Sequence, residues 1–160
     1  MEKKQWPARR GLPHFPGVDR HNRAVIHFIT GCTKDRRRLL ATEIVHQGLL
    51  AAWRVADSFF VGRYVIMPDH IHLFCSPARE TPGYLEAWVR YWKSVATRQF
   101  PGIGRGQFWQ RDFWDTQMRR GESYSSQWDY VHLNPVRHGL VTNPEEWPYQ
   151  GEMHLLDWHD

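Results

Sequence analysis

The sequence predicts a single α+β domain in which an antiparallel sheet carries helices on one face. Three observations support this fold class. Residues 23–33 are rich in β-forming residues and alternate well enough for a strand, and residues 59–67 and 70–76 are predicted as two further strands. Residues 42–56 and 84–100 repeat apolar residues at helical spacing. Pro68 and Asp69 interrupt the second β-rich stretch with turn-forming residues, which indicates a hairpin.

The order of the predicted elements narrows the fold further. It runs strand 23–33, a basic turn at 36–38, helix 42–56 with Thr42 as N-cap, strands 59–67 and 70–76, helix 84–100, short β pieces at 107–109 and 114–118, and a third helix from about 123. This βαββαβ order followed by a C-terminal helix satisfies a ferredoxin-like fold. We expect one domain over 1–160, with a basic N-terminal arm (1–22), a Gly-rich connection (101–106) and a C-terminal tail (149–160).

Composition restricts the function classes. The formal charge is +4, the isoelectric point is about 9.3, and 14% of the residues are aromatic. Basic charge with many aromatic rings suits nucleic acid, although a G+C-rich genome would also enrich arginine. No stretch approaches the roughly 18 apolar residues of a transmembrane helix, and the N-terminus does not resemble a signal peptide. With only two cysteines, we expect a reduced, soluble, cytoplasmic protein.

His70 and His72 are the first candidate site residues. On a strand, side chains two residues apart point to the same face, roughly 6.5–7 Å from each other. Two imidazoles at the start of a strand can therefore share one divalent metal, with open positions for phosphate oxygens. The competing interpretation is a pair of structural histidines.

Tyr130 and Asn134 are the second candidates. A tyrosine hydroxyl can attack a phosphate and form a covalent intermediate, whereas most helical tyrosines simply belong to the core. Tyr124 is the competing nucleophile and would point from a different helix face. Asn134 lies one helical turn after Tyr130 and could supply a third metal ligand. Because Pro135 follows, Asn134 could instead be the N-cap of a short helix that ends at Gly139.

Three segments carry a resemblance to a known family: MPDHIHLF (67–74), FWQRDFWDTQMRR (108–120) and DYVHLNPVRHGLV (129–141). In this order they resemble the REP-associated tyrosine transposases, relatives of the single-tyrosine HUH transposases of insertion sequences. The resemblance implies a ferredoxin-like fold and metal-dependent cleavage of single-stranded DNA near hairpins, with Mg²⁺ or Mn²⁺ as cofactor. It implies His70 and His72 as metal ligands and Tyr130 as nucleophile. Asn134 stands where the related transposases carry a polar ligand, often Gln.

The resemblance also implies a DNA-binding surface and a cellular context. We expect phosphate contacts from seven arginines: Arg9, Arg10, Arg36, Arg37, Arg38, Arg119 and Arg120. Trp109 and Trp114 bracket a predicted turn at Arg111 and Asp112 and could stack on bases or pack in the core. His132 and His138 are interpreted as surface or structural residues. The expected partner is hairpin or single-stranded DNA of palindromic repeats, bound in the nucleoid by a monomer, or alternatively by a dimer.

Two alternatives to a DNA-cutting enzyme stay open. One is a domesticated protein that binds hairpin DNA without cutting it. The other is a small Zn²⁺ hydrolase, which lacks a third protein ligand at suitable spacing and leaves Tyr130 unexplained.

Overall fold

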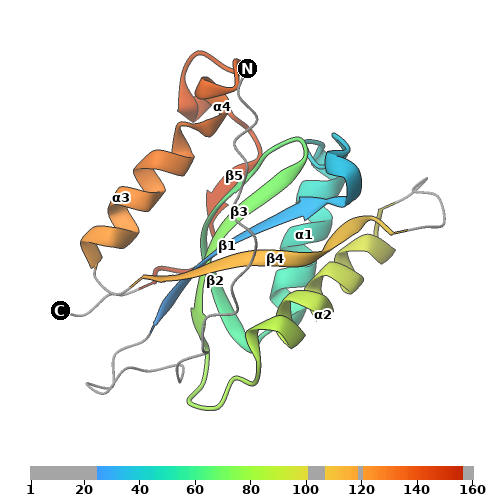
Figure 1. Ribbon diagram of the computed structural model, residues 1–160, viewed down its shortest axis with the longest axis vertical. Helices are drawn as coiled ribbons and strands as arrows, with labels where there is room; N and C mark the ends of the chain where they lie inside the picture. The colour runs from blue at the N-terminus through green and yellow to red at the C-terminus, as the bar shows by residue number, and fades with distance from the viewer. Residues whose placement is uncertain (1–24, 101–106, 119–120, 157–160) are drawn as a thin grey trace.

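A five-stranded antiparallel sheet with the strand order β4-β1-β3-β2-β5 organises the chain (Figure 1). The structure is a computed structural model that describes residues 25–100, 107–118 and 121–156. The strands are β1 (Ile26–Thr33), β2 (Phe59–Ile66), β3 (His70–Pro77), β4 (Trp109–Met118) and β5 (Gln150–Glu152). The helices are α1 (Glu43–Val55), α2 (Leu85–Arg98), α3 (Gly121–His132) and α4 (Asn134–Arg137), with 3-10 turns η1 (Lys34–Arg36) and η2 (Pro144–Glu146). The predicted ferredoxin-like α+β fold is confirmed.

Helices α1 and α2 cover one face of the sheet and bury the larger core (Figure 1). Helix α1 begins where predicted, because the Thr42 hydroxyl accepts a hydrogen bond from the Val45 amide at 3.2 Å. Helix α2 inserts Trp88 and Trp92 into the core. The Trp88 indole donates to the Ala56 carbonyl at 2.7 Å, which satisfies its buried N–H and ties the end of α1 to α2.

Helix α3 lies against the opposite face of the sheet (Figure 1). Phe74 of β3 meets Tyr124 and Trp128 of α3, with ring centroids 4.7 and 6.4 Å apart. Val131 of the same helix is also buried. Strand β3 is therefore covered on both faces, and its residues are buried almost throughout. This second layer brings the C-terminal helices to the face that His70 and His72 share.

The structure corrects two predictions. The β pieces at 107–109 and 114–118 are one edge strand, β4. The predicted turn at Arg111 and Asp112 is a bulge, because the span from Gly31 to Thr33 faces the longer span from Trp109 to Phe113. The predicted tail is also partly ordered. Its residues 150–152 form β5, which pairs with β2.

Several predictions fall on residues outside the described ranges. They concern the N-terminal arm at 1–22 with Arg9 and Arg10, the connection at 101–106, and Arg119 and Arg120. Among the described residues, no helix is long and apolar enough to cross a membrane.

Candidate active site

His70 and His72 lie side by side at the beginning of β3. Their ring centroids are 4.7 Å apart and both residues are buried, at 5% and 3% exposure. They share the α3 face of the sheet with Phe74, as the period of two along a strand predicts. The predicted proximity of the two rings is therefore observed.

Asp69 orients the first imidazole. Its Oδ1 accepts a hydrogen bond from His70 Nδ1 at 2.7 Å, and its Oδ2 accepts one from Arg36 Nε at 2.9 Å. Burial alone would raise the pKa of Asp69, but the hydrogen bonds from His70 and Arg36 outweigh it and hold this pKa well below its usual range. An ionised carboxylate only accepts, so Nδ1 of His70 carries the proton. In the neutral form of His70, Nε2 is therefore the ring nitrogen with the free lone pair.

Thr30 contacts the second imidazole. Its Oγ1 lies 2.9 Å from His72 Nδ1, and the Phe28 ring stacks on the His72 ring at a centroid distance of 5.4 Å. Burial, with smaller effects from His70 and Arg36, lowers the pKa of His72 well below its ordinary value. His72 is therefore neutral near pH 7. The Thr30 hydroxyl can accept a hydrogen bond from the Nδ1–H of His72. This arrangement leaves Nε2 of His72 free to bind a metal.

Helix α4 carries the buried polar side chain of Asn134. Asn134 is buried, and its side-chain oxygen accepts a hydrogen bond from the Arg137 guanidinium. Asn134 lies within α4, and Leu133 occupies the N-cap position, so the N-cap interpretation of Asn134 is wrong. Pro135 has no amide hydrogen to continue the hydrogen bonding of α3, so the chain starts a new short helix there. Ligation by Asn134 stays a prediction.

Arg137 links the tyrosine to this group. Its guanidinium carbon lies 3.9 Å from the centroid of the Tyr130 ring, and it also donates to the Tyr130 carbonyl. Its charge is one of the smaller influences that lower the pKa of His72. Arg137 thus links Tyr130 to Asn134 by direct contacts. Sequence reasoning overlooked it, although it lies three residues after Asn134 within the third family-like segment.

The two candidate tyrosines have different environments. Tyr130 is 47% exposed, so its side chain is accessible to a macromolecule. Tyr124 is buried against Phe74, and burial raises its pKa. A phenol that must reach a phosphate and lose its proton fits the environment of Tyr130 better.

His138 is a further residue that sequence reasoning did not assign to the site. Its ring centroid lies 6.4 Å from that of His70, because the α4 turn returns the chain toward β3. His132 instead contacts Glu145 at 2.9 Å, in agreement with the structural interpretation. Within the described part of the chain, no three His, Cys, Asp or Glu side chains form a group that could hold a metal. A metal at His70 and His72 would therefore need other oxygen donors, such as an amide, water or phosphate.

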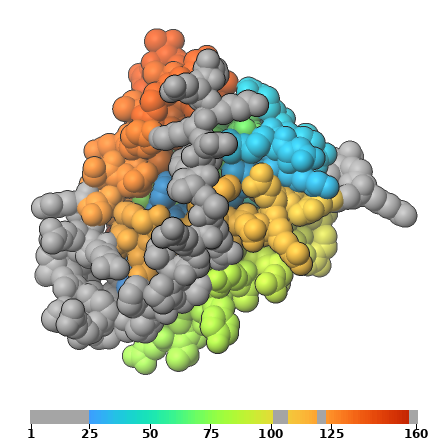
Figure 2. All heavy atoms as spheres, viewed as in Figure 1, coloured from blue at the N-terminus to red at the C-terminus, as the bar shows by residue number. Residues whose placement is uncertain are grey.

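The predicted DNA-binding residues divide into several groups. Arg36 is engaged with Asp69, and Arg37 donates to the carbonyls of Lys34 and Gln107. Arg38 is exposed. Figure 2 shows the segment around η1 (light blue) and the α3–α4 segment (orange) on the same side of the molecule. Trp109 is buried, and its indole donates to Thr97, so base stacking by Trp109 is excluded in this conformation, whereas Trp114 is half-buried.

These features define a ferredoxin-like α+β protein with a buried histidine pair at the start of β3 and an exposed tyrosine on the C-terminal helix α3. The chain is 29% identical over 154 residues to a putative REP-associated tyrosine transposase of Haemophilus influenzae, with 83% of this chain and 86% of the relative covered. It is 26% identical over 125 residues to the REP-associated tyrosine transposase of Escherichia coli K12, with 76% and 73% covered.

The fold comparison points the same way. A solved structure of a REP-associated tyrosine transposase bound to a REP hairpin superposes with a TM-score of 0.69 at 24% identity, covering 91% of this chain and 82% of that one. No protein-family model matches the chain. The resemblance predicted from the three segments is confirmed: the chain is similar in sequence to two REP-associated tyrosine transposases and shares the fold of a third.

Proposed function

We propose that this protein cuts and rejoins single-stranded DNA beside hairpins, with Tyr130 as the nucleophile. Two homologues are named as tyrosine transposases, and the structural relative is bound to a hairpin of repeat DNA. The observation that carries the proposal is local. Asp69 and Thr30 orient two neighbouring imidazoles, and Arg137 contacts both the exposed Tyr130 ring and the side chain of Asn134, the candidate third ligand.

His70 and His72 would hold a divalent cation, Mg²⁺ or Mn²⁺, through their Nε2 atoms. The donor chemistry fits, because His72 is neutral and the Nδ1 atoms of both rings already have oxygen partners. When bound, such a cation polarises the scissile phosphate as a Lewis acid. Asp69 and Thr30 act as positioning residues that keep each ring in one orientation. Asn134 is the candidate for a further oxygen ligand, provided that its amide leaves Arg137.

Tyr130 would carry out the covalent step. Its phenolic oxygen attacks phosphorus, the bond from phosphorus to the 3′-oxygen breaks, and the products are a 5′-phosphotyrosine and a free 3′-hydroxyl. The phenol gives up its proton to solvent during the attack, the departing 3′-oxygen takes one up from solvent, and the guanidinium of Arg137 stabilises the developing negative charge. Attack by a 3′-hydroxyl on the phosphotyrosine reverses the step and releases Tyr130.

One observation favours a second function, hairpin binding without cleavage. The amide oxygen of Asn134 is occupied by the cationic side chain of Arg137, which also covers the Tyr130 ring. If this arrangement persists with DNA and metal present, the protein recognises hairpins but does not cut them.

A covalent-adduct assay separates the two functions. Labelled hairpin oligonucleotides with single-stranded flanks, taken from palindromic repeats near the coding region, are incubated with protein and Mn²⁺, Mg²⁺ or EDTA. We expect an adduct on a denaturing gel with metal, none with EDTA, and none with Tyr130→Phe. Tyr91→Phe is the matched control, because Tyr91 is also 47% exposed but lies on α2.

Two other outcomes of this assay would count against the proposed cleavage by Tyr130. An adduct that survives Tyr130→Phe contradicts the assignment of the nucleophile. Hairpin binding that Tyr130→Phe leaves unchanged, with no adduct under any metal condition, supports the binding protein instead.

A further inference from the structure

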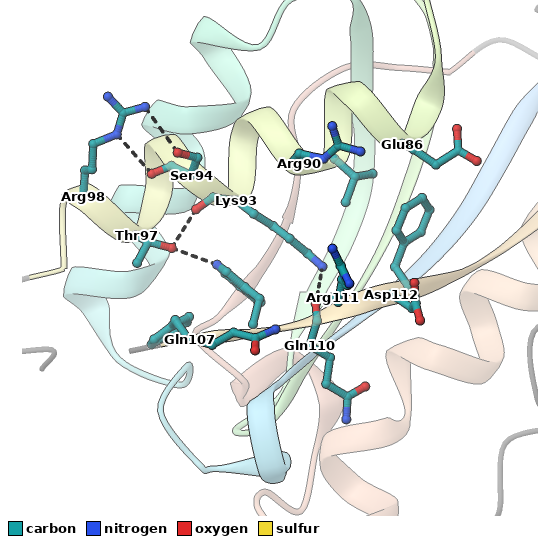
Figure 3. Close-up of a pocket in the computed structure, with 14 residues that line it drawn as sticks. Glu86, Arg90, Lys93, Ser94, Thr97, Arg98, Gln107, Gln110, Arg111 and Asp112 are labelled. Atoms are coloured by element: carbon teal, nitrogen blue, oxygen red, sulfur yellow. Dashed lines mark hydrogen bonds between the residues drawn. The ribbon is translucent and has the colours of Figure 1, made fainter. Parts of the chain in front are cut away.

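A groove of about 900 Å³ lies between α2 and the edge strand β4 (Figure 3). It opens on the sheet face that α1 and α2 cover, whereas His70 and His72 lie on the α3 face. Six charged residues line it: Glu86, Arg90, Lys93, Arg98, Arg111 and Asp112. The groove is therefore separate from the candidate active site and has an excess of positive charge.

Lys93 crosses the groove as a buried cation. It is 7% exposed, and Figure 3 shows its side chain extending from α2 to β4. Its ammonium donates to the Gln110 carbonyl at 3.2 Å and lies 5.6 and 5.9 Å from the ring centroids of Trp109 and Phe113. Among the residues described, it has no other hydrogen bond and no ion pair. An ammonium has three donors, so two remain for a ligand.

The bulge in β4 creates this arrangement. Between Trp109 and Phe113, β4 has more residues than the facing part of β1, so the regular pairing is interrupted around Gln110. The Gln110 carbonyl accepts from Lys93. A bulge that redirects backbone and side chains is typical of strands beside binding sites.

Burial of the charged Lys93 side chain destabilises the folded state. Burial lowers its pKa to about 8, while Cys32 and Asp112 have smaller opposite effects. The side chain is still mostly protonated at pH 7, so a cation is buried here with no ion-pair partner within residues 25–100, 107–118 and 121–156. A bound anion would offset this cost.

The groove walls complete a site for such an anion. Arg90 on α2 and Arg111 on β4 are both exposed, and Figure 3 shows them near the end of the Lys93 side chain. Glu86 on α2 and Asp112 on β4 both lie toward the end of the groove opposite to Arg98 (Figure 3). The Trp109 and Phe113 rings are buried, so the groove offers cations and not free aromatic faces for base stacking.

We propose that the α2–β4 groove binds a phosphate group through Lys93 at its floor and Arg90 and Arg111 at its walls. The phosphate belongs to a single strand of DNA or to a free nucleotide. Binding of a DNA strand rests on the proposed function, because the groove would be a second contact on the DNA outside the cleavage site. Binding of a free nucleotide does not depend on the proposed function.

Binding measurements in EDTA test the proposal without any cleavage. The full chain is titrated with a fluorescent ten-nucleotide thymidine strand that has no hairpin, and separately with AMP and inorganic phosphate. Lys93→Met keeps most of the side-chain length and removes the charge. We expect strand binding to weaken about tenfold, with a smaller dependence on salt, because one phosphate contact is lost. Arg54→Gln on α1 is the control, since Arg54 is exposed outside the groove and its loss changes the net charge equally.

A double variant, Arg90→Gln with Arg111→Gln, provides a second test at exposed positions, which does not depend on how Lys93→Met folds. Competition by AMP would support a free nucleotide as the ligand, and binding of the strand alone would support DNA. Affinities and salt dependence that match those of Arg54→Gln in both groove variants would overturn the proposal. Adduct formation at Tyr130 is assayed separately, so a failure of cleavage and a failure of groove binding give different results.

Discussion

Thr30 and His72 are direct partners in the pairing of β1 with β3, and the Thr30 hydroxyl lies 2.9 Å from Nδ1 of the imidazole. The register of the sheet therefore sets the orientation of a candidate metal ligand. A shift of one residue would move Thr30 to the other face and break this contact. The same pairing places Cys32 opposite His70, whose Nδ1 is held by its neighbour Asp69.

Thr30→Val should weaken metal binding. Valine has nearly the same shape as threonine but cannot accept a hydrogen bond from the Nδ1–H of His72. The ring of His72 therefore loses its preferred orientation. We expect the affinity for Mn²⁺, measured by calorimetry, to fall about tenfold. Thr116→Val is the control, because Thr116 is an exposed residue of β4. Equal Mn²⁺ affinities for both variants would contradict the positioning role of Thr30.

Asp69→Asn should lower both metal affinity and adduct formation. The substitution preserves size but removes the negative charge that holds His70 Nδ1 and Arg36. Loss of such a partner typically costs 10- to 100-fold in metal affinity or activity. Asp57→Asn removes a comparable but exposed ion pair, that with Arg79, and should have little effect. Full activity of Asp69→Asn would show that the carboxylate is not needed at the site.

Arg137→Gln tests whether Arg137 assists Tyr130 or blocks it. If the guanidinium stabilises the charge that develops during attack, the rate of adduct formation should fall by about 10- to 100-fold. Arg137→Lys should recover only part of the rate, because an ammonium cannot stack flat on the ring. Faster adduct formation in Arg137→Gln would instead identify Arg137 as an inhibitory contact.

Acid should destabilise the metal-free protein below about pH 6.5. Burial lowers the folded-state pKa values of His46 and His72, so the unfolded chain binds protons that the folded chain does not. The free energy of unfolding is therefore highest above pH 6.5 and decreases as the pH falls toward 5. Urea titrations in EDTA at pH 8, 6 and 5 measure this trend.

His46→Gln offers a variant for the same experiment. Glutamine can still bond to the Tyr64 hydroxyl, which lies 2.7 Å from His46 Nε2, but it does not titrate. The dependence of stability on pH should become shallower in this variant. Stability that rises on acidification in the unmodified chain would contradict the burial of neutral histidines.

Lys93→Met should stabilise the protein at pH 7. The folded-state pKa of Lys93 is lowered to about 8, below the unfolded value of 10.5, so protonation opposes folding at neutral pH. Stability of the unmodified chain should rise between pH 8 and 10.5, and the advantage of the variant should disappear over the same range. We expect a gain on the order of 1–3 kcal/mol at pH 7 in urea unfolding. A less stable variant at pH 7 would show that the contacts of the ammonium outweigh its burial.

The periodic elements could be predicted because their signals are local. Alternation along a strand placed His70 and His72 on one face, and the apolar spacing defined α1 and α2 within a few residues. The N-cap at Thr42 followed from a hydroxyl before an apolar helix. The three segments with family resemblance identified Tyr130 as the candidate nucleophile and predicted the similarity to REP-associated tyrosine transposases, whereas the exposure of Tyr130 is a finding of the structure.

Contacts between distant segments could be decided only by the tertiary structure. The charged residues Arg111 and Asp112 suggested a turn, but pairing with β1 extends the strand through a bulge. Strand β5 is three residues long and is defined by its pairing with β2, not by a pattern of its own. The partners of the histidines, Thr30 and Asp69, and the placement of Arg137 over Tyr130 depend on strand register and on the direction of the short helix after Pro135. Local periodicity and motif thus determine which groups are candidates for the chemistry, whereas the orientation of those groups arises from long-range packing that no local pattern encodes.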